Sequence, residues 1–113
     1  MVQLEIPMAP KGKARPRFTG KFAYMPKEYM QWKAEFSQRA SAQYGGPVIE
    51  DPVKVRVIFR TPTGKMRSDL DNAIGSVLDA IQPLILKNDR QVHEIFTCVV
   101  EGKTMIEVTI EVC

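Results

Sequence analysis

The stretch Arg67-Ser-Asp-Leu-Asp-Asn-Ala-Ile-Gly-Ser-Val-Leu-Asp-Ala-Ile81 decides how this chain folds. Its apolar residues recur every three or four positions, which predicts an amphipathic helix from about Asp69 or Leu70 to Ile81. Pro83 follows and ends the helix, because proline cannot continue it. The apolar side of such a helix must be buried, so the flanking segments should supply the layer on which it packs.

Those flanking segments are predicted to be strands and one further helix. Alternating apolar and polar residues predict strands at 2–6, 52–60, 95–100 and 104–112, with a hairpin turn at Gly102-Lys103. A second amphipathic pattern predicts a helix from Lys27 to about Gln43. The order strand, basic loop, helix, strand, helix, hairpin predicts a small α+β fold. It would be one domain over residues 1–113, with two helices packed on a mixed sheet.

The composition fits a folded protein of the reducing cytoplasm. The chain has 113 residues, of which 44% are hydrophobic, so it can form a core without disulfides. No segment is long and apolar enough to cross a membrane, and the first residues lack the apolar core of a signal peptide. The two cysteines, Cys98 and Cys113, do not have the spacing of a metal site.

Charge is distributed unevenly along the chain, although the net charge is only +3. Residues 1–27 contain six basic residues and one acid, and residues 54–68 contain five basic residues and no acid. The last segment, 92–113, is acidic. This segregation predicts a basic face, which suits nucleic acid better than a neutral metabolite. The alternative is an ordinary solvated surface.

Basic residues occupy alternate positions in the first of these segments, which prolines and a glycine keep from being helical. In an extended chain alternate residues share one side, so these cations would form a stripe that tracks a phosphate backbone. The stripe consists of Lys11, Lys13, Arg15, Arg17 and Lys21.

Three aspartates indicate a site for a hard cation. Asp69 and Asp71 flank the first residue of the helix, and Asp89 lies in a polar loop before a strand. Mg²⁺ is usually held by one or two carboxylates together with a substrate phosphate. Two residues along a helix are about 200° apart. The first two carboxylates therefore converge only if Asp69 is extended and Asp71 lies in the first turn.

A purely structural interpretation stays open at this point. Ser68-x-x-Asp71 resembles a capping box, and acids in a first turn complement the helix dipole. Asp79 lies on the same helical stripe as Asp71 and Gly75, where it either extends the site or is an ordinary exposed acid.

Four motifs together resemble the RusA family, small phage- and prophage-borne endonucleases that resolve Holliday junctions. Their order and spacing agree over nearly the whole chain. They are Lys13-Ala-Arg-Pro-Arg-Phe18, Ser68-Asp-Leu-Asp-Asn72, Val77-Leu-Asp-Ala80 and Asn88-Asp-Arg-Gln-Val92. The resemblance implies a bacterial or phage-encoded, nucleoid-associated homodimer in recombination and repair. It would nick two opposed strands of four-way DNA.

The resemblance also implies roles for individual residues. Asp69, Asp71 and Asp89 would be the catalytic acids that bind Mg²⁺, with Mn²⁺ as an alternative ion. The DNA contacts would come from the basic residues Lys11, Lys13, Arg15, Arg17, Lys65 and Arg67.

The chain departs from the family at two positions. Gly75 stands where the family often has a lysine implicated in catalysis, and Asn88 stands where it commonly has the first of two acids. Lys65 or Arg67 could instead supply charge at the scissile phosphate. The departures leave open a junction-binding protein without catalysis. A nuclease for flaps, replication forks or RNA is a third interpretation.

Overall fold

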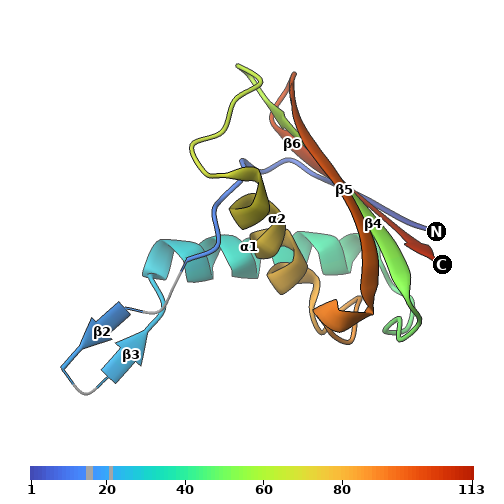
Figure 1. Ribbon diagram of the computed structural model, residues 1–113, viewed down its shortest axis with the longest axis horizontal. Helices are drawn as coiled ribbons and strands as arrows, with labels where there is room; N and C mark the ends of the chain where they lie inside the picture. Colours follow the sequence, from blue (N-terminus) through green and yellow to red (C-terminus); the bar gives the residue numbers. More distant parts are fainter. Residues whose placement is uncertain (15–16, 21) are drawn as a thin grey trace.

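The computed structural model describes residues 1–14, 17–20 and 22–113, with the backbone alone for 17–19 and 22 (Figure 1). Its main sheet has the strand order β1-β6-β4-β5. These strands are β1 (Val2–Ile6), β6 (Met105–Val112), β4 (Val53–Thr61) and β5 (Val92–Glu101). β6 is antiparallel to both β1 and β4, whereas β5 is parallel to β4. The prediction of a mixed sheet is confirmed. The predicted hairpin at Gly102-Lys103 is wrong, because β4 lies between β5 and β6 and pairs with both of them.

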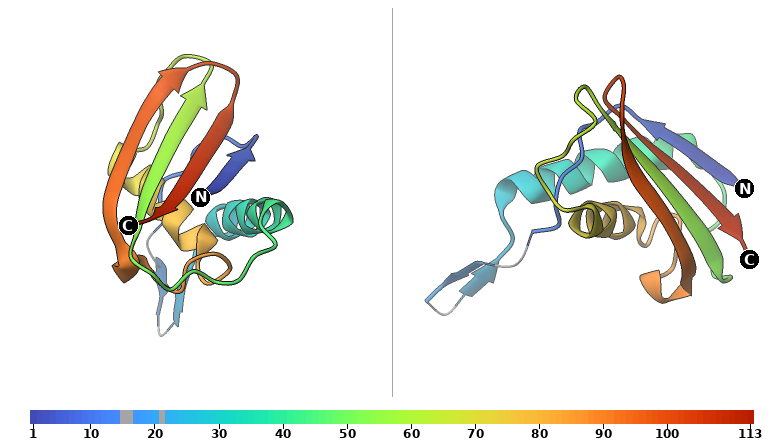
Figure 2. Two further views of the ribbon diagram at one scale, coloured as in Figure 1. Left: turned by 90° about the vertical axis from the view of Figure 1, so that its right-hand side faces the viewer. Right: turned by 45° about the horizontal axis from the view of Figure 1, so that its top comes forward.

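Both helices cover the same face of this sheet (Figure 2). The helices cover this face because the apolar side chains of β4 point to it. Val55, Val57 and Phe59 are buried there, and the residues between them point to the other side of the sheet. α2 (Leu70–Ile81) buries its apolar stripe between the sheet and α1 (Lys27–Gln43). The predicted α+β fold with two helices on a mixed sheet is therefore confirmed. Neither helix has the length and apolarity to span a membrane.

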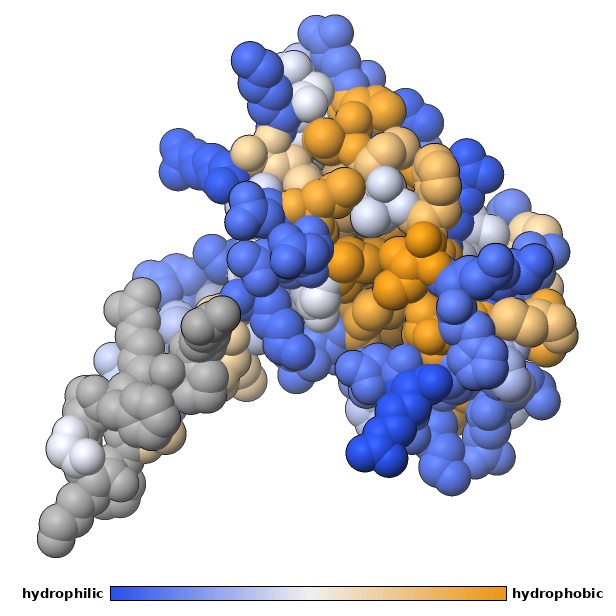
Figure 3. Space-filling model, viewed as in Figure 1, coloured by the Kyte–Doolittle hydropathy of each residue, from blue (hydrophilic) through white to orange (hydrophobic). Residues whose placement is uncertain are grey.

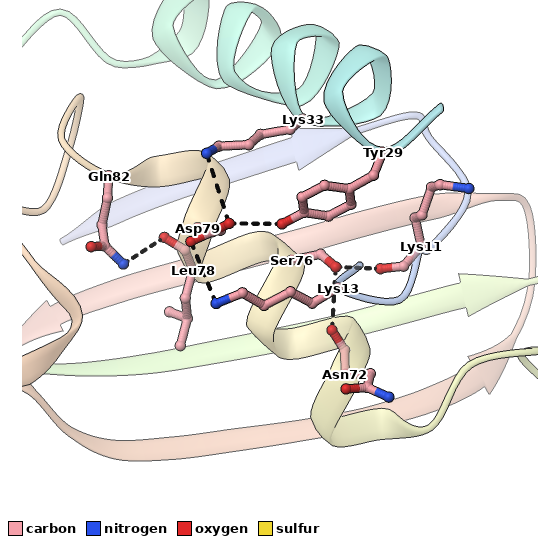
Figure 4. A network of polar contacts seen from close by, with 9 residues as sticks. All are labelled: Lys11, Lys13, Tyr29, Lys33, Asn72, Ser76, Leu78, Asp79 and Gln82. Carbon is pink, nitrogen blue, oxygen red and sulfur yellow. Dashed lines mark hydrogen bonds and ion pairs between the residues drawn. The ribbon is translucent and has the colours of Figure 1, made fainter. Parts of the chain in front are cut away.

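The N-terminal basic segment differs from its prediction. Arg17–Thr19 (β2) and Phe22–Tyr24 (β3) form an antiparallel hairpin that projects from the body of the molecule (Figure 1). The chain reverses at Gly20, whose φ of +61° is a conformation that glycine adopts without strain. Within the described residues the predicted single cationic stripe is wrong, because the side chains of Lys11 and Lys13 point in different directions (Figure 4). Arg15 and Lys21 lie outside the described residues.

The parallel pairing of β4 and β5 sets the direction of α2. Val53 at the start of β4 is the partner of Val92, and Thr61 at its end is the partner of Glu101. The chain leaves β4 at one end of the sheet and must enter β5 at the other end. α2 therefore runs back along the sheet, and its two ends lie near opposite ends of the strands (Figure 1).

The loop after β1 is fastened along the first turns of α2. The Lys13 amide donates to the Asn72 carbonyl oxygen over 3.1 Å, and the Ser76 hydroxyl donates to the Lys11 carbonyl oxygen over 2.6 Å. Between these bonds, a Cβ at Gly12 would lie 2.9 Å from Ser68 Cβ. The loop can approach the helix this closely only because residue 12 has no side chain.

Replacing Gly12 with alanine should lower the free energy of unfolding by about 1–3 kcal/mol, because the added methyl overlaps Ser68 Cβ and cannot be accommodated without displacement. Urea denaturation monitored by circular dichroism measures the change. Gly45→Ala is the matched control, since its Cβ would meet nothing within 4 Å. The Gly12→Ala, Ser68→Gly double variant should recover most of the loss. Equal stability of Gly12→Ala and the wild type would contradict this packing.

Candidate metal and phosphate site

Two aspartates are presented at the start of α2. Asp69 is the N-cap residue, with an extended backbone (φ −67°, ψ 152°), and Asp71 lies in the first turn. The arrangement required for their carboxylates to converge, one extended and one helical, is present. The predicted capping box is not formed. The N-cap residue is Asp69 rather than Ser68, and the Asp69 carboxylate makes no capping hydrogen bond within the described residues. Asp71 Oδ1 accepts from the Asn72 amide over 3.0 Å.

A pocket of about 410 Å³ lies beside this helix start. It is formed between the loop 9–12 and the loop 61–68, and its charged lining residues are Lys11, Lys65 and Arg67. No carboxylate lines it among the described residues. Three cations around a hollow next to exposed carboxylates form a suitable environment for a phosphate group.

Thr61 holds the loop that carries two of these cations. Its buried hydroxyl donates to the Lys65 carbonyl oxygen over 2.9 Å. Its own carbonyl oxygen accepts from the Gly64 and Gly102 amides over 3.2 and 2.9 Å. Gly64 has a φ of +72°, which favours glycine at this turn. The last residue of β4 therefore fixes the loop that carries Lys65 and Arg67.

The basic residues of β4 do not contribute to this positive region. On the open face of the sheet, Lys54 pairs with Glu94 at 3.4 Å and Arg60 pairs with Glu107 at 3.0 Å. The hydrogen bond to Glu107 raises the pKa of the Arg60 guanidinium. Arg56 lies over the Phe96 ring, 5.0 Å from its centroid. The acids of β5 and β6 thus compensate Lys54 and Arg60, whereas Lys11, Lys65 and Arg67 have no ion pair with any described residue.

Lys13 points away from Lys11 and along α2 (Figure 4). Its ammonium nitrogen lies 3.6 Å from Asp79 Oδ1, and Lys33 approaches Oδ2 of the same carboxylate at 3.7 Å. The Tyr29 hydroxyl donates to Asp79 Oδ2 over 2.8 Å. Burial raises the pKa of Tyr29, and the hydrogen bond and charge of Asp79 raise it further. Asp79 thus belongs to a polar network with α1. Local sequence patterns do not predict this network, because its members are remote along the chain.

Asn88 has a local structural role. Its side-chain oxygen accepts from the Arg90 amide over 3.0 Å, and its own amide donates to Gln91 Oε1 over 3.1 Å. These two bonds form a capping box for the short 3₁₀ helix η1 (Asp89–Gln91) that precedes β5. An asparagine at this position is therefore explained by capping.

The expected convergence of Asp69, Asp71 and Asp89 does not occur within one chain. Asp89 begins η1, beyond the far end of α2, whose 12 residues span about 18 Å. In the part of the chain that the structure describes, no group of three or more His, Cys, Asp or Glu side chains could hold a metal ion. The physical reason is the parallel pairing of β4 and β5, which places the start of α2 and the start of β5 at opposite ends.

Comparison with known proteins identifies the family. No curated protein matches the chain. The family model for the endodeoxyribonuclease RusA matches residues 7–111 of the 113, a range that includes all three aspartates and the basic pocket. The chain therefore belongs to the RusA family of endodeoxyribonucleases, which resolve Holliday junctions.

Proposed function

We propose that this protein is a Mg²⁺-dependent endonuclease that resolves four-way DNA junctions as a homodimer. The observation that carries the proposal is the position of two exposed carboxylates, Asp69 and Asp71, beside a pocket lined by Lys11, Lys65 and Arg67. Cleavage of a phosphodiester needs both features at one place. Acids hold the metal ion and cations hold the negatively charged backbone.

The donor set fits Mg²⁺, which prefers oxygen ligands and is commonly held by one or two carboxylates. Asp69 is not engaged in capping, and neither aspartate pairs with a basic residue of the described chain. Bound there, the ion would polarise the phosphodiester and activate a water molecule. Lys11, Lys65 and Arg67 would hold the phosphate against these carboxylates. The arginine can bind two phosphate oxygens at once.

The partner's Asp89 would complete each site. A two-fold axis perpendicular to α2 interchanges the ends of the two copies, so it brings the partner's Asp89 toward Asp69 and Asp71. The face of the molecule seen in Figure 3 carries apolar side chains over α2 and β5. Ile95 is 50% exposed, and the outer edge of β5 has no neighbouring strand in the described sheet. An exposed apolar strand edge of this kind is typical of an interface.

Such a dimer suits the substrate. A four-way junction has approximate two-fold symmetry, so two identical sites would meet two strands of the same polarity and nick them symmetrically. The β2–β3 hairpin, which includes the backbone of Arg17, projects from the body, and the DNA contact of Arg17 remains a prediction. Arg15 remains a predicted contact outside the described residues.

Binding of junctions without cleavage is the second candidate function. Gly75 favours it, because no lysine is attached to α2 at that position. Incubating the protein with a mobile four-way junction and Mg²⁺, with and without chelator, separates the two functions. A panel of flap, fork and RNA substrates tests the third interpretation.

Asp71→Asn should reduce junction cleavage by at least about 100-fold, because an amide is a poorer metal ligand than a carboxylate. Junction affinity should be retained or increased, since a negative charge near phosphate is removed. Single-turnover cleavage and gel-shift titration in chelator measure the two quantities. Asp51→Asn, at an exposed acid of the loop before β4, is the matched control and should cleave normally. Full cleavage by the Asp71→Asn protein would refute its role.

A mixed dimer tests whether Asp89 acts across the interface. Asp71→Asn and Asp89→Asn chains are co-expressed with different tags and purified as the heterodimer. If the partner supplies Asp89, one of the two sites retains all three carboxylates, so the mixture nicks one strand although each parent is inactive. An inactive heterodimer that still binds junctions would show that each chain uses its own Asp89.

A further inference from the structure

The Lys13 side chain lies on the surface of α2 at Gly75 (Figure 4). Its Cδ and Cβ would be 3.4 and 3.7 Å from a Cβ at residue 75, so they occupy space that a longer side chain there would fill. The Lys13 backbone is fixed by its amide, which donates to the Asn72 carbonyl oxygen. Lys13 therefore covers Gly75 of α2 from a neighbouring loop, with its backbone held by the bond to Asn72 and its side chain lying along the helix.

The ammonium group rests on a carboxylate that is itself firmly held. Asp79 accepts the Tyr29 hydroxyl and also faces Lys33, both from α1. The Tyr29 hydroxyl is a donor at physiological pH, as an ordinary tyrosine is, and burial and Asp79 raise its pKa further. The contact with Lys13 is looser, at 3.6 Å, and the Lys13 side chain is 48% exposed. An ion pair so exposed to water is weak and exchangeable.

Gly75 lies midway between two acids of one helical stripe. Asp71 precedes it by four residues and Asp79 follows it by four. Side chains four residues apart on a helix are separated by about 5–6 Å between Cβ atoms. The Lys13 side chain, which lies over Gly75, can reach in either direction along this stripe, because its four-carbon chain is flexible. Turned toward Asp71, its ammonium group would approach the end of α2 that carries the metal and phosphate site.

We propose that Lys13 is a two-position phosphate ligand, held by Asp79 in the free protein and transferred to the DNA phosphate beside Asp71 on binding. Asp79 is then a positioning residue rather than a metal ligand, and Gly75 provides the space in which the lysine turns. This inference rests on the proposed function, because a phosphate must be bound at the start of α2 for Lys13 to exchange partners.

A double-mutant cycle tests the exchange. Affinity for a synthetic four-way junction is measured in chelator for the wild type, Lys13→Met, Asp79→Asn and the double variant, over a series of salt concentrations. Asp79→Asn should tighten binding about two- to fivefold, since the competing partner of the lysine is lost. In the Lys13→Met background this tightening should disappear, and Lys13→Met should lower the salt slope by about 1.

Lys33→Met is the matched control, because Lys33 faces the same carboxylate from α1. It should show no coupling to Asp79→Asn in junction affinity. Gly75→Leu would fill the space of the Lys13 stem and should abolish the Lys13–Asp79 coupling. Gly75→Ala, whose Cβ makes only ordinary contact at 3.4 Å, should preserve it. Thermal unfolding of each variant separates these effects from loss of folding.

The outcomes distinguish this inference from the proposed function. If the wild type binds and cleaves junctions but the Lys13 and Asp79 effects are additive, the two-position lysine is refuted and the nuclease remains. If Asp79→Asn tightens junction binding equally with and without Lys13, the two-position lysine is also refuted, because the effect then comes from removal of the Asp79 charge alone. If the wild type binds no junction at all, both are refuted.

Discussion

The parallel pairing of β4 with β5 is the constraint on which the rest of the structure depends. A parallel neighbour requires a crossover, and α2 is that crossover. Because α2 runs back along the sheet, its acidic start lies at the end where β4 finishes, beside the loop that Thr61 holds. The same parallel pairing places Asp89 beyond the far end of α2. One chain therefore contains the parts of a metal site without gathering them, which is why symmetry matters to the proposed chemistry.

The positive regions of this protein are set by which basic residues lack an acidic partner, rather than by how many basic residues a segment contains. Lys54 and Arg60 of β4 face acids of β5 and β6 across the open side of the sheet, so two of the three cations of this strand are locally compensated. Positive charge remains where no acid is in register, in the loops beside the start of α2. There Lys11, Lys65 and Arg67 surround a hollow, and Lys13 pairs with Asp79, which lies two helical turns beyond Asp71 on α2. The proposal that Lys13 exchanges between Asp79 and a DNA phosphate, while Lys11, Lys65 and Arg67 line the pocket, follows from this arrangement.

Local patterns were sufficient to predict most of the fold. The helices at 27–43 and 70–81 follow from apolar periodicity and from the glycines and proline that end them, and β4 follows from strict alternation. The β2–β3 hairpin was missed because its strands have three residues each, too few to show alternation. Asn88 was interpreted only as a departure from the family's paired acids, although it caps a 3₁₀ helix that is too short to show a periodicity in the sequence.

The sequence by itself determined the helices, the mixed α+β class and the family motifs, because each depends on neighbours within a few residues. It gave the placement of Asp69 and Asp71 only as a condition, which the structure meets with Asp69 extended and Asp71 in the first turn. Only the tertiary structure decided which charges remain unpaired, that Lys13 lies on Gly75 and reaches Asp79, and that Asp89 is remote within one chain. Those facts depend on strand order and direction. These are set by the burial of whole faces against each other, and no local pattern encodes them.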